Sequence, residues 1–583
     1  MPKTSAKDKV QVMAAKGPHA SSLSQKLKSK QSKAAKHEVV IARAGTGKTF
    51  TQIVGVGHVF GDDTLWTDIC LKVTDTPDGI VPSEAQKLIW DAMALSSDAK
   101  TVTYCAFNKS IVTEFEEEWG WMQKRLQELG VNLQFATVNA LGSRIITQAY
   151  GFKKANDWHA VNLLEKVTGK DSRELRRKSP TAVNAVKNLV GLCKLNLIGW
   201  TEEDGFNSES ICDEDLDQLC NHHDIELNGS RRKVFDYTKA VLDLCLKVDD
   251  NKEIDWNDQN WLPIVLNLPI PKVDLLLVDE AQDLPRVRQE FARKMGRRLI
   301  VVGDDRQAIY GFAGADTDSI PRLMNLLNVK EPLKLTETRR CGKAIVAEAQ
   351  KIVPDFTAHE DNPKGVILTD TTETYGARAE DGDMVLCRVN APMISQALQF
   401  IKDGRKATIR GRDFGKSLVK FVEKQKATDV SDLIQKVSDW RELESQKENS
   451  KKFPSEAKLI GIQDKAECIM AFCDNAITVK DVTDKIDLVF SGKQCPKCEQ
   501  RFNDEVLICY KCKCGTKTPE GIQFSSVHRA KGLESDRVFI LKVKGADMPH
   551  PMAKSAWQIG QEMNLKYVAI TRAKQELVYV YDA

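Results

Sequence analysis

A lysine and a threonine that follow two closely spaced glycines are the residues of this chain best suited to chemistry. Residues 39–42 are apolar and mostly β-branched, which predicts a buried strand, and the residues from Lys48 onward suit the first turn of a helix. A glycine-containing loop at this junction surrounds phosphate oxygens with backbone N–H groups and the helix dipole. The Lys48 ammonium can reach the outer phosphates of a nucleoside triphosphate, and the Thr49 hydroxyl can ligate Mg²⁺. We therefore expect a nucleotide to bind at Ala44, Gly45, Thr46, Gly47, Lys48 and Thr49.

A second apolar run ends in two adjacent carboxylates. Residues 273–278 predict another buried strand, and Asp279 and Glu280 follow directly at its carboxyl end. Two carboxylates in that place are costly unless a cation lies beside them. We therefore expect Asp279 to hold Mg²⁺ together with Thr49, and Glu280 to polarise the attacking water. A solvated acidic turn is the alternative, and the partner phosphate loop argues against it.

Strands and helices alternate along the rest of the chain. Strand patterns recur in both halves, at residues 101–106, 133–136, 298–303, 384–388, 538–541 and 577–580. Such alternation around a phosphate loop predicts an α/β fold with a doubly wound parallel sheet and ligands at the carboxyl ends of the strands. The second half repeats the pattern without a second phosphate loop. We therefore expect a second lobe that closes over the nucleotide-binding one.

Changes in pattern along the chain divide it into lobes, insertions and a tail. Residues 1–37 carry nine lysines against one acid, which predicts a flexible tail that either contacts nucleic-acid phosphates or is simply solvated. In the second insertion, Leu433, Ile434, Val437 and Trp440 are expected on one helix face. The predicted parts are a basic tail (1–37), a first lobe (38–150 and 260–330), a helical insertion (151–259), a second lobe (331–413 and 521–583), a second helical insertion (414–490) and a zinc ribbon (491–520).

The composition is that of an ordinary globular protein. The 583 residues are 42% hydrophobic and 29% charged, and the net charge is only +3. Nucleic-acid binding would therefore depend on local basic surfaces. Because no apolar run approaches the roughly 20 residues that span a bilayer, and no signal peptide is evident, we expect an intracellular, cytoplasmic protein without membrane partners.

Five of the fifteen cysteines crowd into residues 495–514. Paired C-x₂-C knuckles bring four thiolates within tetrahedral reach of Zn²⁺, and so short a ribbon has little other core. A redox pair is the alternative. The ten scattered cysteines are expected to behave as small buried hydrophobes without a disulfide framework. The expected zinc ligands are Cys495, Cys498, Cys509 and Cys512, with Cys514 as the alternative fourth ligand.

Five sequence blocks occur in an order that resembles the superfamily-one DNA helicases of the UvrD/Rep type. The blocks are residues 44–49, 278–283, 303–315, 527–534 and 567–574. The resemblance implies two RecA-like lobes that bind ATP and Mg²⁺ and translocate along single-stranded or tailed duplex DNA. The implied direction is 3′ to 5′, and the implied context is replication, repair or recombination.

The resemblance also implies roles for single residues on the ATP side. Gln307 would sense the γ-phosphate, and Arg340 and Arg572 would be arginine fingers from the second lobe. Glu534 would contact the sugar side of the nucleotide. Arg339 stands where the family usually has a tyrosine that stacks on adenine, and a guanidinium plane can stack as well.

On the DNA side, aromatic, amide and hydroxyl groups at strand ends suit single-stranded nucleic acid, because rings stack on bases while small polar groups hold phosphates. The residues at family positions for these contacts are Phe107, Asn108, Thr137, Tyr310, Phe312 and His528. Tyr310 and Phe312 have core packing as their alternative.

Several positions depart from the family pattern. Asn139 stands where histidine is common, Phe312 where tryptophan is common, and Ala42 where the phosphate-loop consensus has glycine. The adenine-reading glutamine is either Gln25, which has roughly the usual spacing, or Gln86, which has the better local context but follows the phosphate loop.

Two other functions remain alternatives at this point. One is a translocase that displaces proteins or serves a partner without unwinding DNA, and no nuclease constellation is apparent in the sequence. The other is a regulatory nucleic-acid-binding module with a vestigial ATPase. Against the second stands the joint presence of Lys48, Asp279, Glu280, Gln307, Arg340 and Arg572.

Overall fold

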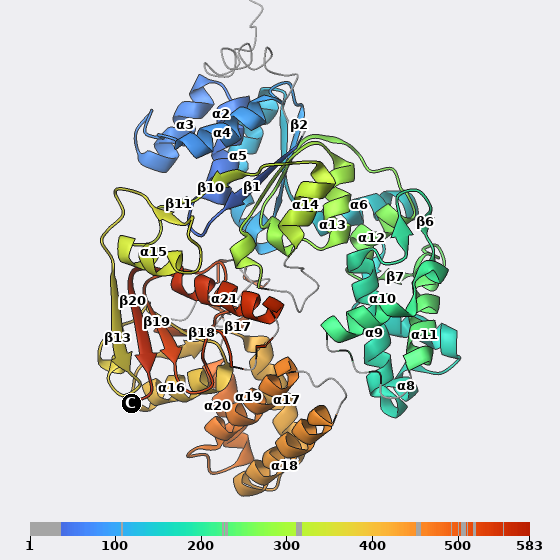
Figure 1. Ribbon diagram of the computed structural model, residues 1–583, viewed down its shortest axis with the longest axis vertical. Coiled ribbons are helices and arrows are strands. Elements are labelled where there is room, and N and C mark those ends of the chain that lie inside the picture. The colour runs from blue at the N-terminus through green and yellow to red at the C-terminus, as the bar shows by residue number, and fades with distance from the viewer. Residues whose placement is uncertain are drawn as a thin grey trace, which may run out of the picture.

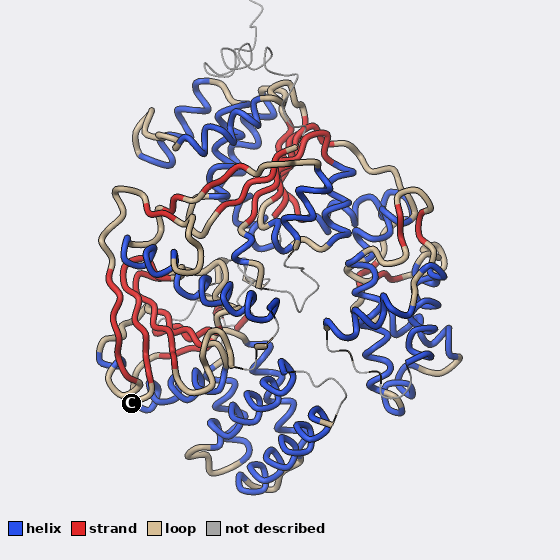
Figure 2. Tube along the Cα trace, in the orientation of Figure 1, coloured by secondary structure: helices blue, strands red, loops and turns tan. Residues whose placement is uncertain are grey.

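Two parallel six-stranded sheets form the frame of the protein in its computed structural model, and Figure 2 shows their strands in red. The structure describes residues 37–583 apart from 107–108, 224, 226, 228–230, 310–317, 451–455, 491–492, 499–500, 503–508, 510, 513, 517–520, 552 and 555. Within this described part, no helix is both long and apolar enough to cross a membrane. The expected α/β class with two parallel-sheet lobes is confirmed.

The first sheet has the strand order β10-β1-β9-β8-β2-β3, and each neighbouring pair is parallel. Successive residues of a strand point to opposite faces, so Val39 belongs to one hydrophobic core and Val40 to the other. Both faces are buried, as is usual for parallel sheets. The strands are β1 (Glu38–Ala42), β2 (Thr101–Ala106), β3 (Asn132–Thr137), β8 (Val273–Val278), β9 (Gly296–Gly303) and β10 (Leu333–Leu335).

Helices cover both faces of the first sheet. On one face, the core contains Trp90, Phe115 and Met122 from the helices α2 to α5. On the other face, Ile145, Trp261 and Phe291 come from helices of the first lobe that also pack against the insertion. The two sets are α2 (Lys48–Phe60), α3 (Asp63–Thr74), α4 (Glu84–Ala94) and α5 (Lys109–Glu128), and then α6 (Val138–Tyr150), α12 (Asp258–Val265), α13 (Arg286–Met295) and α14 (Ser319–Leu327).

The first insertion is a helical body that lies beside the first lobe (Figure 1). Its interior holds the fully buried Lys194, whose Nζ lies 2.5 Å from Asp255 and 2.6 Å from Asp258. A buried ammonium is tolerated because both carboxylates compensate its charge. The helices are α7 (His159–Thr168), α8 (Ser172–Lys178), α9 (Pro180–Asn196), α10 (Asp213–His222) and α11 (Arg231–Cys245), with the two-residue strands β4 (Lys154–Ala155), β5 (Trp200–Thr201), β6 (Gly205–Phe206) and β7 (Glu253–Ile254).

The second lobe is built on a sheet with the order β13-β20-β19-β14-β18-β15, again parallel throughout. Helix α21 lies between this sheet and the first lobe, and its N-terminal end points toward the first insertion (Figure 1). The elements are β11 (Glu337–Thr338), α15 (Lys343–Gln350), β12 (Thr357–Ala358), β13 (Val366–Thr371), β14 (Met384–Cys387), α16 (Asn390–Lys402), β15 (Ala407–Ile409), β18 (Ile522–Ser526), β19 (Ser535–Lys542), α21 (Ala556–Ile570) and β20 (Ala573–Tyr581).

The second insertion consists of helices whose apolar faces join the core of the second lobe. Leu433 and Val437 are fully buried there, whereas Ile434 is 40% exposed. Leu433 and Val437 are four residues apart and share a helix face, while Ile434 is turned about 100° from Leu433. The helices are α17 (Arg412–Gln425), α18 (Val430–Asn449), α19 (Glu456–Cys473) and α20 (Val479–Val489), and the short antiparallel strands β16 (Lys493–Gln494) and β17 (Arg501–Phe502) follow.

Candidate functional site

The phosphate loop connects β1 to α2, as its sequence predicts. Gly45 and Gly47 have φ values of 66° and 74°, in the left-handed region that glycine adopts without steric cost. This conformation brings the chain from the end of the strand directly into the first turn of the helix, where backbone N–H groups have no partner within the helix. The N-terminus of α2 therefore forms a site suited to an anion.

The two carboxylates after β8 lie next to this loop. The Thr49 hydroxyl donates to Asp279 Oδ2 at 2.7 Å, and the Tyr104 hydroxyl donates to the same oxygen at 2.7 Å. Lys48 Nζ lies 3.1 Å from Glu280 Oε1. Adjacent hydroxyl and carboxylate oxygens are the donors that Mg²⁺ prefers, so Thr49 and Asp279 fit the expected metal.

The pKa values of the two adjacent acids, Asp279 and Glu280, are shifted in opposite directions. Burial would raise the pKa of Glu280, but Lys48 and Lys531 outweigh it and lower that pKa to about 2. Burial, together with the neighbouring Glu280 charge, raises the pKa of Asp279. Glu280 also has a φ of 50°, a strained conformation for a residue with a Cβ, and such strain concentrates at functional positions. Glu280 is therefore a charged acceptor held rigidly beside the lysine.

Gln307 is held from both lobes. Its Nε2 donates to Asp304 Oδ2 at 2.7 Å, and its main-chain carbonyl accepts from Lys531 Nζ of the second lobe at 2.8 Å. Lys531 also lies 2.5 Å from Asp283 Oδ2, just after the acid pair. A movement of the second lobe would therefore change a direct contact of Gln307.

Arg340 lies directly over the phosphate loop. A Cβ built on Gly45 would be only 2.5 Å from Arg340 Cβ, so the second-lobe arginine packs where a side chain at Gly45 would be. The Arg340 guanidinium lies 2.6 Å from Glu534 Oε2, and Lys574 lies 2.8 Å from the other oxygen of Glu534. Glu534 therefore compensates the charge of Arg340 at the edge of the site.

Arg572 is the second arginine of this lobe near the site. It is buried, and its guanidinium donates to the carbonyls of Val568 and Leu533 at 3.0 Å each. Burial, together with the nearby charge of Arg340, lowers the pKa of Arg572 to about 10, although Glu280 across the seam acts in the opposite direction. Arg340 thus packs on the phosphate loop, whereas Arg572 lies close enough to Arg340 and Glu280 for their charges to act on it but donates its hydrogen bonds within its own lobe.

Further hydrogen bonds join the lobes at this seam. The Ala44 N–H donates to the Tyr567 hydroxyl at 3.1 Å. Asn564 Nδ2 donates to the carbonyl of Ala308 at 3.2 Å and to that of Asp305 at 3.4 Å. Both second-lobe residues belong to α21. The structure therefore has α21 in contact with the phosphate loop and with the segment that follows β9.

Two of the residues predicted to contact adenine, Gln86 and Arg339, are described by the structure. Gln86 Nε2 donates to the Thr51 hydroxyl at 3.0 Å, and Gln86 caps α4 together with Ser83, so this glutamine lies one helical turn from the phosphate loop. Arg339 is exposed, and its guanidinium lies 2.8 Å from His359 Nε2. Gln25 lies outside the described residues.

On the expected DNA side, two of the six predicted residues are described. The Thr137 hydroxyl accepts from the Ala140 N–H at 3.1 Å and caps α6. Burial lowers the pKa of His528 to about 3, with Arg388 and Arg529 acting in the same direction, so the imidazole is neutral at pH 7. Phe107, Asn108, Tyr310 and Phe312 lie outside the described residues.

Two cavities have Trp557 in their linings. The larger, of about 1160 Å³, is lined by Trp200, Arg286 and Trp557 among others, between the first lobe, the first insertion and α21. The smaller, of about 290 Å³, is lined by Arg388, His528 and again Trp557. Trp557 therefore stands at their junction, and sequence reasoning missed it.

Trp557 also meets the first insertion. Its ring centroid lies 5.1 Å from that of His222 at the end of α10. Trp557 is 42% exposed despite this contact. The available signal in the sequence was an isolated tryptophan at the start of a helix, which by itself resembles any surface aromatic residue.

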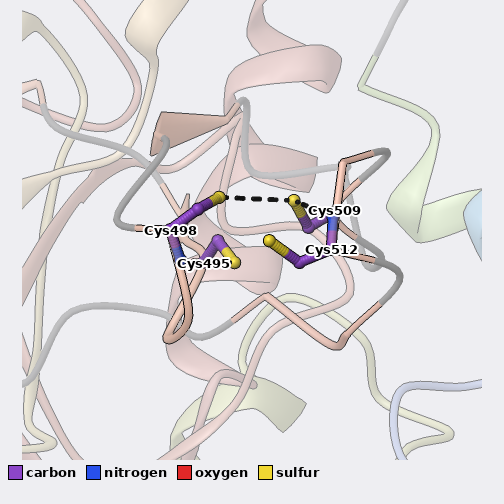
Figure 3. A group of neighbouring side chains, drawn as sticks. All are labelled: Cys495, Cys498, Cys509 and Cys512. Carbon is purple, nitrogen blue, oxygen red and sulfur yellow. Dashed lines mark hydrogen bonds between the residues drawn. The ribbon is translucent and has the colours of Figure 1, made fainter.

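The cysteine cluster forms a compact group, shown in Figure 3. The sulfurs of Cys495, Cys498, Cys509 and Cys512 all lie within 4.8 Å of one another, and these four could hold a metal ion. Cys514 Sγ is 3.3 Å from Cys495 Sγ. Burial would raise the pKa of Cys495, but the N–H groups of Cys498 and Lys497 lower it to about 6, which favours the thiolate that a metal requires.

The two parallel-sheet lobes, with a phosphate loop in one and two arginines from the other at their seam, define a two-lobed P-loop nucleotide-binding protein. Residues 121–327 match the UvrD/REP helicase N-terminal domain, and residues 373–583 match the UvrD-like helicase C-terminal domain. The chain belongs to the UvrD/Rep family of helicases.

Curated relatives agree with this assignment. The chain is 24% identical over 328 residues to F-box DNA helicase protein 1 of Schizosaccharomyces pombe. The alignment covers 53% of this chain and 34% of the relative. It is 23% identical over 342 residues to the mitochondrial ATP-dependent DNA helicase HMI1 of Saccharomyces cerevisiae. That alignment covers 58% of this chain and 40% of the relative. A stretch of 81 residues is 31% identical to DNA helicase II of Escherichia coli, covering 13% of this chain and 11% of the relative. The chain thus spans well under half the length of these relatives.

The Gly45→Ala variant should bind nucleotide poorly. Alanine would be strained at a φ of 66° and would clash with Arg340, and together these effects should weaken affinity for a fluorescent ATP analogue by at least about tenfold. The matched control is Gly461→Ala on α19, because a Cβ there meets no atom within 4 Å. Equal affinities in a binding titration of both variants would contradict the observed loop geometry.

Proposed function

We propose that this protein is an ATP-dependent DNA helicase that moves along single-stranded DNA in the 3′ to 5′ direction and acts in replication, repair or recombination. The observation that carries the proposal is the packing of Arg340 of the second lobe on Gly45 of the phosphate loop, with Lys48 and Glu280 beside it. A triphosphate bound at this loop would contact both lobes at once. Because ATP and DNA are found inside cells, we infer an intracellular protein.

The residues of the first lobe supply the hydrolytic machinery in this proposal. Lys48 binds the outer phosphates, and Thr49 and Asp279 hold Mg²⁺, which when bound neutralises phosphate charge. Glu280 stays ionised at neutral pH, since its pKa is lowered to about 2, and accepts a hydrogen bond from the attacking water. The hydrogen bond that Gln307 donates to Asp304 holds the Gln307 side chain in position to contact the γ-phosphate.

The residues of the second lobe make closure depend on the nucleotide. Arg340 exchanges Glu534 for phosphate oxygens when ATP is present, and Arg572 adds a second positive charge. After hydrolysis and phosphate release, these arginines lose their partner, so the closed state loses its advantage. Repeated closing and opening would move one lobe relative to the other along a bound strand.

The two cavities that meet at Trp557 offer a path for that strand. Arg286 and Arg322 line the larger cavity and provide positive charge for phosphates. Trp557 offers an exposed ring on which a base can stack, and His528 lies beyond it in the smaller cavity. The path joins the first lobe to the second, as a motor that steps along DNA requires.

We further propose that the four-cysteine group binds one structural Zn²⁺. Four thiols within 4.8 Å of one another meet the tetrahedral preference of zinc. The N–H groups of Lys497 and Cys498 each lie 3.4 Å from Cys495 Sγ, and the Cys512 N–H lies 3.3 Å from Cys509 Sγ. Such bonds stabilise the negative thiolates that a bound metal needs.

ATP hydrolysis should be stimulated by single-stranded DNA. Purified protein is assayed for phosphate release with and without a single-stranded oligonucleotide, together with Glu280→Gln. That variant should bind ATP normally and turn over about 10²–10⁴-fold more slowly, because the group that polarises the water is lost. The same preparations are then tested for strand displacement on duplexes with a 3′ or a 5′ tail.

The proposed motor function would be refuted if single-stranded DNA did not change the rate of ATP hydrolysis, or if Glu280→Gln hydrolysed ATP at the wild-type rate. Displacement only from the 5′ tail would reverse the proposed direction. DNA-stimulated hydrolysis without displacement from either tail would replace the helicase with a translocase that does not unwind DNA by itself.

Trp557→Ala should weaken DNA binding. Loss of one stacked base typically costs about 1–3 kcal/mol, so affinity for a fluorescent single-stranded oligonucleotide should fall by roughly 5-fold or more. Trp256→Ala is the matched control, because Trp256 is 53% exposed and does not line either cavity. If fluorescence anisotropy gives the same dissociation constant for both variants, the strand does not pass Trp557.

Elemental analysis should find about one zinc per chain. Cys512→Ser should lose the metal, whereas Cys514→Ser should retain it, because Cys512 and not Cys514 belongs to the group of four thiols. If Cys512→Ser retains the metal and Cys514→Ser loses it, the fourth ligand is Cys514 instead of Cys512. Metal-free wild-type protein from a chelator-free preparation would refute the site.

A further inference from the structure

We propose that Arg43 and Asp355 form a clasp between the lobes that positions Gln307 for hydrolysis. The inference rests on the proposed ATPase function and assigns a positioning role to two residues outside the nucleotide contacts. Arg43 occupies the phosphate loop between Ala42 and Ala44, and Asp355 belongs to the second lobe, shortly after α15.

The contact between Arg43 and Asp355 is a two-pronged ion pair. Arg43 Nε donates to Asp355 Oδ1 and Arg43 Nη2 donates to Asp355 Oδ2, each at 2.9 Å. The Arg43 side chain is only 7% exposed, while that of Asp355 is 37% exposed. Because a planar guanidinium and a planar carboxylate fit together in one orientation, this pair fixes the angle between the lobes as well as their distance.

The third nitrogen of the same guanidinium turns back into the first lobe. Arg43 Nη1 donates to Asp304 Oδ1 at 3.0 Å and to Asp305 Oδ1 at 2.6 Å. The other oxygen of Asp304 accepts the hydrogen bond from Gln307 Nε2 at 2.7 Å. An unbroken series of charge-assisted contacts therefore runs from Asp355 in the second lobe to the side chain of Gln307.

Charge balance explains why the series acts as a unit. Asp304 is fully buried, and burial raises its pKa although the charges of Lys48 and Arg43 act in the opposite direction. Arg43 thus offsets part of the cost of burying the carboxylate that accepts the hydrogen bond from the Gln307 amide. Asp355 in turn fixes the Arg43 side chain. The second lobe therefore influences the side chain of Gln307 through this series, in addition to the hydrogen bond that Lys531 donates to the Gln307 carbonyl.

The arrangement makes Asp355 a selective probe. Without the Asp355 carboxylate, Arg43 still pairs with Asp304 and Asp305 inside the first lobe. Asp355→Asn should therefore leave the first lobe, its nucleotide contacts and the other contacts across the seam intact, and should weaken only the link between Arg43 and the second lobe. Arg43→Lys is the complementary change, because it keeps the charge but loses the planar fork.

The experiment compares wild type, Asp355→Asn, Arg43→Lys and the double variant, with Asp381→Asn as a control at an exposed acid of the same lobe. ATP turnover at saturating single-stranded DNA gives kcat and KM. Small-angle X-ray scattering with and without AMP-PNP measures compaction of the lobes. We expect Asp355→Asn to lower kcat about tenfold with KM changed less than twofold, and to reduce the compaction. The double variant should be little worse than either single variant, because both break the same link.

Wild-type kcat and wild-type compaction in Asp355→Asn would overturn the clasp while leaving the proposed ATPase intact. A parallel rise in KM would also overturn it, because that would show an effect on nucleotide binding instead of on positioning. If the wild type itself does not hydrolyse ATP, the proposed function fails, and the scattering measurement still decides whether the clasp closes the lobes. If Arg43→Lys does not fold, the comparison of Asp355→Asn with Asp381→Asn remains decisive.

Discussion

The balance of buried charge at the seam between the lobes is the interaction on which the rest of the structure depends. Lys48 lies against Glu280, Arg43 against Asp304, and Lys531 against Asp283. Each ion would be costly in a protein interior without its partner, and the partners are contributed by separate segments and, for Lys531, by separate lobes. The seam therefore assembles only when both sheets are folded and correctly placed.

This dependence connects the nucleotide site to the cavities beyond it. Helix α21 contacts the phosphate loop through Tyr567, the segment after β9 through Asn564, and the first insertion through Trp557. A rigid helix that contacts all three cannot shift at one end without moving at the other. The proposed nucleotide-dependent motion of the second lobe would thus reach the proposed DNA path through α21.

The elements that sequence reasoning predicted well are those governed by local pattern. The runs at 101–106 and 273–278 are the strands β2 and β8, and both are buried on two faces as continuous apolar runs suggest. Ile434 shows where a local pattern fails, because membership of an apolar cluster in the sequence does not give the direction of each side chain. Arg43 is a stronger case, since its three carboxylate partners lie more than 250 residues away in the chain.

The sequence by itself determined the phosphate loop, the acid pair, the parallel α/β class and the cysteine knuckles, because each depends on residues close together in the chain or on a hydrophobic period. Only the tertiary structure decided which side of the second lobe faces Lys48, that Arg340 packs on Gly45, that Arg43 meets Asp355, and that Trp557 joins two cavities. These facts depend on how two separately folded sheets are placed relative to each other. That placement arises from many weak contacts between distant segments, and no local pattern of residues records it.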